Sequence, residues 1–77
     1  MNNEHGIKIT ERDRVMKAWQ DSMELVRDFK LYAKEMEGDK RLFEIFQEFA
    51  EDEAVHASKF LEILHGFDKK RATENKL

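Results

Sequence analysis

The chain of 77 residues contains no cysteine and no proline. Without cysteine it has no disulfide, no thiolate zinc site and no cysteine nucleophile, so any metal ligands must be carboxylates and imidazoles. Without proline, no helical pattern is interrupted by a residue that lacks a backbone donor. A domain this short gains only a little stability from its own core, so we expect help from oligomerisation or from a metal.

Long apolar runs are also missing. No stretch approaches the roughly 20 apolar residues of a membrane span, and residues 1–9 do not resemble a signal peptide. Charged residues make up 40% of the chain, but the net charge is only -3 and both signs are interspersed, which leaves no electrostatic footprint for nucleic acid. We therefore expect a cytoplasmic protein that binds neither membranes nor nucleic acid.

What the chain does contain is helical periodicity, in two long stretches. In the first stretch, Thr10 and Asp13 form the pattern of a capping box, which predicts that a helix begins at Glu11. Apolar residues then recur at helical spacing, so this helix should run to about Glu37. Residues 1–9 are polar and aperiodic, and we expect them to be disordered.

The second stretch follows a short turn. Gly38 offers the left-handed residue that ends a helix, and Asp39 can cap the next one. That helix should run from about Lys40 to His65, where Gly66 offers a second stop. Two long helices joined by so short a turn must run antiparallel, so the sequence predicts an all-α fold built as a two-helix hairpin.

The apolar faces of both predicted helices are broader than the single seam along which two helices touch. A second hairpin is needed to cover them, and a two-fold homodimer that forms a four-helix bundle is the economical solution, although a higher homo-oligomer also satisfies it. The predicted domain organisation is a disordered N-terminus over residues 1–9, the hairpin over residues 10–67 and a polar tail over residues 68–77.

One charged residue lies where only apolar residues are expected. On a helical wheel, one face of the second helix consists of Leu42, Phe46, Phe49, Ala50, Ala57, Phe60, Leu64 and Phe67. Glu53 lies in the middle of that face, and His56 is one turn further on, about 60° away. Burying a lone carboxylate among phenylalanines costs several kcal/mol unless a cation, a donor or a proton compensates it.

A Glu-x-x-His pair that points into a helix bundle is typical of di-iron and di-manganese carboxylate proteins. In a dimer, the two-fold axis can bring together Glu53 and His56 of both chains, a nitrogen and oxygen donor set that suits iron, manganese or zinc. The alternative is a metal-free bundle in which Glu53 pairs with His56 or with its symmetry mate.

These residues resemble a known family. The run from Gly38 to His56, with Phe46, Ala50, Glu53 and Ala57 in step, is similar to the second helix of a rubrerythrin-type ferritin-like half-bundle. On the first helix, Phe29, Tyr32 and Ala33 are similar to the aromatic and small positions of that family. The resemblance covers residues 15–66 and implies two irons that react with dioxygen or peroxide in a four-helix bundle, which in encapsulated ferritins is completed by dimerisation.

The resemblance implies that Glu53 and His56 are metal ligands. It also implies a ligand glutamate on the first helix, where this chain has Ser22 or Val26 at the inward position. Asp21 and Glu24 are the secondary candidates, reaching the site across the dimer interface.

Two functions follow as hypotheses. The first is a small iron-binding protein that acts as a ferroxidase or a peroxidase-type oxidoreductase, with manganese or zinc as alternative metals; no residue is assigned a catalytic role. The second is a metal-free ferritin-like hairpin that serves to dimerise or to dock on a protein partner.

Overall fold

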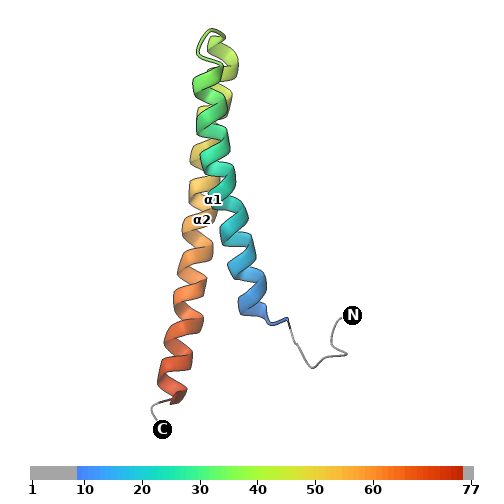
Figure 1. The fold of residues 1–77 in the computed structure, drawn as a ribbon. Helices are drawn as coiled ribbons and strands as arrows, with labels where there is room; N and C mark the ends of the chain where they lie inside the picture. Colours follow the sequence, from blue (N-terminus) through green and yellow to red (C-terminus); the bar gives the residue numbers. More distant parts are fainter. Residues whose placement is uncertain (1–8, 76–77) are drawn as a thin grey trace.

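The computed structural model describes residues 9–75, which form two helices, α1 (Glu11–Glu35) and α2 (Lys40–Asn75). The helices pack as an antiparallel hairpin, close together at the turn and diverging toward the start of α1 (Figure 1). The predicted all-α hairpin is therefore confirmed. Over the described residues, neither helix has an apolar stretch sufficient to cross a membrane. Residues 1–8, most of the predicted disordered N-terminus, and residues 76–77 of the predicted tail lie outside the described residues.

The first helix begins as the sequence predicted. The backbone N–H of Asp13 donates to the Thr10 hydroxyl oxygen (3.1 Å), and the backbone N–H of Thr10 donates to Asp13 Oδ2 (3.0 Å). This reciprocal capping box satisfies two backbone donors at the start of α1. The same hydrogen bond from the Thr10 backbone is the main reason that the pKa of Asp13 lies below its ordinary value.

The turn between the helices differs from the prediction in one respect. The N–H of Met36 donates to the carbonyl oxygen of Tyr32 (2.9 Å), and the N–H of Asp39 donates to that of Met36 (2.9 Å). As predicted, Asp39 caps α2, since its Oδ1 accepts from the N–H of Leu42 (3.2 Å). The predicted left-handed conformation of Gly38 is wrong, because its φ does not lie in the positive region. The hydrogen bonds of the turn close the first helix without Gly38 in the left-handed region.

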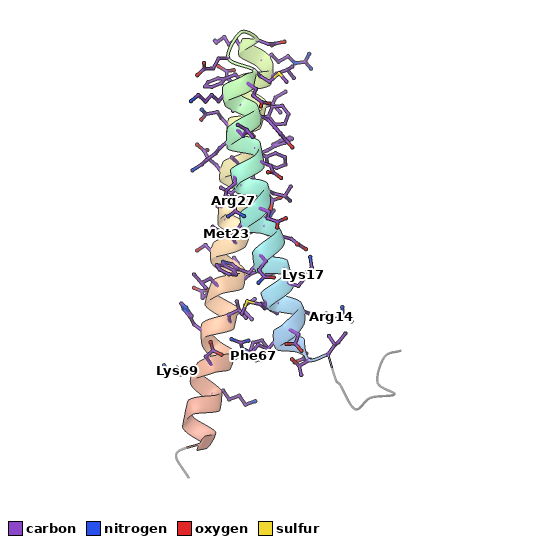
Figure 2. The ribbon with its side chains drawn as sticks, viewed as in Figure 1. Arg14, Lys17, Met23, Arg27, Phe67 and Lys69 are labelled. Carbon is purple, nitrogen blue, oxygen red and sulfur yellow. The ribbon has the colours of Figure 1, made fainter. Side chains whose placement is uncertain are left out.

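The predicted stop at Gly66 is also wrong, because α2 continues through it to Asn75. Packing across the hairpin extends beyond this glycine: Phe67 is half-buried and lies between the lower parts of the two helices (Figure 2). One residue later, Asp68 accepts hydrogen bonds from Arg12 at 2.9 Å and 3.3 Å, which ties the start of α1 to α2 and raises the pKa of Arg12. These contacts outweigh the roughly 1 kcal/mol that glycine costs inside a helix.

A line of mostly small residues forms the seam where the two helices touch. The buried residues of the seam are Ser22 and Ala33 on α1 and Ala50, Ala57 and Leu64 on α2. The three on α2 recur every seven residues, the spacing that keeps one stripe of a helix against its partner. Because this stripe occupies the seam, most of the larger aromatic residues remain beside it and are only partly covered.

The continuous helix at Gly66 yields a stability prediction. Gly66 is exposed, and a Cβ built on it meets nothing within 4 Å. Gly66→Ala should therefore raise the free energy of unfolding by about 0.5–1 kcal/mol, measured by urea denaturation, because alanine loses less backbone entropy in a helix. The matched control is Ala54→Gly at an exposed position of the same helix, which should lower it by a similar amount. A loss of stability in Gly66→Ala would mean that this glycine ends the helix.

The capping box yields a pH prediction. A carboxylate whose pKa is lowered in the folded state stabilises the fold above its unfolded-state pKa, about 3.9 for Asp, and this contribution is lost as the pH falls through the folded-state pKa. Asp13→Ala should therefore be less stable than the unaltered protein at pH 7, and the difference should shrink as the pH falls below about 4. Urea midpoints of both proteins between pH 2 and pH 7 measure this. A difference that is the same at every pH would contradict it.

Candidate metal centre

Glu53 and His56 lie one turn apart on α2, at the edge of the seam. Glu53 continues a stripe of half-buried residues that recur every seven positions, Phe46, Glu53, Phe60 and Phe67. Its side chain is 21% exposed, so Glu53 is half-buried, whereas the sequence predicted a buried carboxylate. Its Oε1 lies 3.4 Å from Nδ1 of His56, which makes the two side chains neighbours.

His56 is more exposed than the sequence predicted. Its side chain is 58% exposed, so the expectation that it shares the buried side is wrong for the single hairpin. The physical reason is that α1 covers only one edge of the apolar arc of α2, the edge that carries Ala50 and Ala57. His56 lies at the other edge, seven residues after Phe49 and seven before Ile63.

An uncovered apolar surface surrounds this pair. Its exposed members are Leu25 and Tyr32 on α1 and Leu42, Phe49 and Ile63 on α2, beside the half-buried Phe46 and Phe60; we call this surface the open face. Ring contacts across the hairpin join its two halves, with centroids 5.6 Å apart for Tyr32 and Phe46 and 6.2 Å apart for Phe29 and Phe49. Glu53 and His56 are thus polar residues within an apolar surface.

The donor atoms of the pair fit a metal ion. Bonds of about 2.0–2.2 Å at a tetrahedral angle place two ligand atoms of one ion roughly 3.4 Å apart, and Glu53 Oε1 and His56 Nδ1 are separated by 3.4 Å. The same separation is long for an N–H···O hydrogen bond, which is usually about 2.7–3.2 Å. A carboxylate and an imidazole of this kind suit iron, manganese or zinc.

One chain does not assemble a complete ligand set. Among the described residues, no three side chains of Asp, Glu or His come close enough together to hold a metal ion. Asp21 is paired with Lys17 instead, at 2.6 Å from its Nζ, and this hydrogen bond raises the pKa of Lys17. Glu24 is exposed and lines a shallow hollow with Trp19 and other residues of α1. The inward position of α1 is held by Ser22, which is buried.

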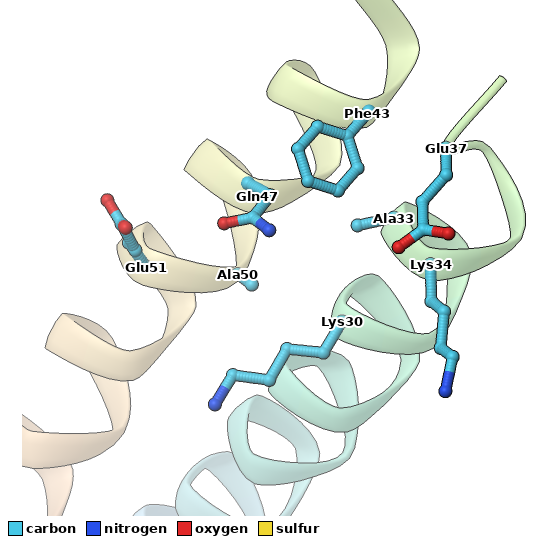
Figure 3. Close-up of a pocket in the computed structure, with 8 residues that line it drawn as sticks. All are labelled: Lys30, Ala33, Lys34, Glu37, Phe43, Gln47, Ala50 and Glu51. Carbon is cyan, nitrogen blue, oxygen red and sulfur yellow. The ribbon is translucent and has the colours of Figure 1, made fainter. Parts of the chain in front are cut away.

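A second hollow lies at the other edge of the seam. This groove of about 480 Å³ is floored by Ala33 and Ala50, with Lys30 extending along it toward α2 (Figure 3). The sequence analysis did not predict it; the small side chains of Ala33 and Ala50 in the seam are the only sequence signal for it. Among the described residues that line it there is no imidazole, and the positive charges of Lys30 and Lys34 disfavour a bound cation.

Comparison with known proteins gives one match. A family model described as rubrerythrin matches residues 22–77 of the chain. The matched region contains all of α2 and therefore both predicted ligands, Glu53 and His56, and it also contains Glu24, whereas Asp21 precedes it. No curated protein and no solved structure matches the chain.

Proposed function

The chain belongs to the rubrerythrin family, and we propose that two copies of its hairpin form a four-helix bundle that binds iron between their Glu53–His56 pairs. The observation that carries this proposal is the position of a half-buried carboxylate, with an imidazole 3.4 Å away, within the open face. A two-fold axis at this point supplies two carboxylates and two imidazoles, which is the donor set that one chain lacks.

The length of the hairpin supports a second copy as the occupant of the open face. On α2, the part paired with α1 extends from the cap at Asp39 to the ion pair between Asp68 and Arg12. Glu53 lies midway between these two ends. A two-fold axis near Glu53 therefore aligns the two hairpins over their full length and covers the largest apolar area, which is the main driving force for association.

Within such a bundle each residue has a defined task. Glu53 supplies negative charge and an oxygen donor, and His56 supplies a neutral nitrogen donor. The partner's open face removes water from both side chains, which strengthens their electrostatic interaction with a cation. Iron, when bound, supplies the redox chemistry for oxidising ferrous ion or reducing peroxide; manganese and zinc suit the same donors.

The missing third ligand favours a second candidate function. Because no three potential ligands come together among the described residues, the hairpin also suits a metal-free role, in which the open face serves only to dimerise or to dock on a protein partner. Metal binding separates the two functions, whereas dimerisation is common to both.

The assembly is tested by one charge placed on the open face. Ile63→Glu should dissociate the dimer, because it introduces an uncompensated charge at a position that is 45% exposed in the hairpin but covered in the bundle. Val55→Glu is the matched control, since Val55 is 60% exposed and lies on the opposite side of α2. Sedimentation at tens of micromolar should show a monomer for Ile63→Glu and a dimer for Val55→Glu and the unaltered protein. A helical monomer in the unaltered protein would rule out the bundle.

The metal is tested through Glu53. Adding ferrous ion without oxygen at a hundredfold excess over Kd should stabilise the protein by about 2.7 kcal/mol, and Glu53→Leu should abolish this stabilisation. Without metal, Glu53→Leu should be neutral or stabilising, because it replaces a desolvated charge with a side chain that matches the surrounding phenylalanines.

Glu62→Leu is the control for the metal test, because Glu62 is an exposed glutamate on the opposite side of the same helix. Its response to ferrous ion should equal that of the unaltered protein. If the unaltered protein melts identically with chelator and with ferrous, manganous or zinc ion, metal binding is excluded and docking becomes the better account.

A further inference from the structure

Ser22 is a polar residue in an apolar seam. It is 6% exposed and is the only buried polar residue among those that the structure describes. Its hydroxyl makes no hydrogen bond within the described part of the chain. The other buried residues of the seam are alanines and a leucine, which have no polar side-chain atom. Alanine would fill this position equally well. Because buried polar groups are normally hydrogen-bonded, the hydroxyl needs a hydrogen-bond partner that the single hairpin does not supply.

The register of the hairpin places Ser22 level with the candidate metal ligands. Phe29 and Phe49 are in ring contact across the hairpin, with centroids 6.2 Å apart. Because the helices are antiparallel, moving two turns back along α1 and two turns forward along α2 keeps the two positions at the same height. Ser22, seven residues before Phe29, is therefore level with His56, seven residues after Phe49. Glu53, one turn before His56, lies in the stripe next to the seam.

We propose that Ser22 is a positioning residue of the metal site, whose hydroxyl donates a hydrogen bond to the carboxylate of Glu53 in the metal-bound dimer. The proposal rests on the function proposed above. Carboxylates that bind metals are generally held in place by a hydrogen bond from a neighbouring group. Oε1 of Glu53 lies beside His56, so Oε2 remains for such a donor. Among the side chains of α2 near this level, Ala57 has no acceptor, and His56 is 58% exposed at the edge of the apolar face away from the seam, which leaves Glu53.

The experiment removes the hydroxyl group from each of two serines that lie at similar heights along the hairpin, one buried and one exposed. Ser22→Ala removes the buried hydroxyl, and Ser58→Ala removes an exposed one two residues after His56. Each protein is titrated with cobaltous ion, whose visible absorption reports binding, and melted without metal. Ser22→Ala should bind cobalt about tenfold more weakly than the unaltered protein, with a melting temperature without metal that is unchanged or higher. Ser58→Ala should match the unaltered protein in both measurements.

The outcomes separate this proposal from the one on which it rests. Ser22→Thr, which keeps a hydroxyl, should restore the affinity; if its extra methyl prevents folding, the two alanine variants decide the matter. If the unaltered protein binds cobalt and Ser22→Ala binds it equally well, the positioning role is overturned and iron binding stands. If the unaltered protein binds no metal at all, both proposals fail.

Discussion

The structure depends on the fact that two helices can cover each other along only one seam. In this hairpin the seam is taken by a stripe of mostly small residues that includes Ala50 and Ala57 on α2, opposite Ser22 and Ala33 on α1. Small residues let the helices come close, but they leave the larger aromatic side chains outside the contact. The open face is the direct result, and exposed apolar surfaces of this kind often mark interaction sites.

The same constraint explains the position of the candidate ligands. Glu53 lies between the seam and the open face, so α1 withdraws it from water without supplying a cation. His56 lies one turn on, at the outer edge of the apolar arc. The inward position of α1 carries Ser22, which has no carboxylate, so the site that we propose needs the ligands of a second copy. The proposed assembly and the proposed metal site therefore share one surface.

The helix ends show where local rules are sufficient. The capping box of Thr10 and Asp13 and the cap at Asp39 were predicted from their side chains alone, because a cap involves only residues within one turn. The two glycines were misjudged, since a glycine permits a left-handed stop but does not require it. At Gly66 the outcome depended on Phe67 and on the ion pair of Arg12 with Asp68, a contact between residues 56 positions apart in the sequence.

By itself the sequence determined the helices, their antiparallel arrangement, the family and the pair of candidate ligands. These depend on periodicity and on residues three or four positions apart, which are visible along the chain. Only the tertiary structure decided which edge of the apolar face α1 covers, and hence that Glu53 is half-buried while His56 is exposed. A helical wheel drawn from the sequence treats a broad apolar face as one surface. A partner helix of about 10 Å diameter covers only part of that face. The sequence placed either Ser22 or Val26 at the inward position of the first helix, and only the packed structure showed that Ser22 is the buried one.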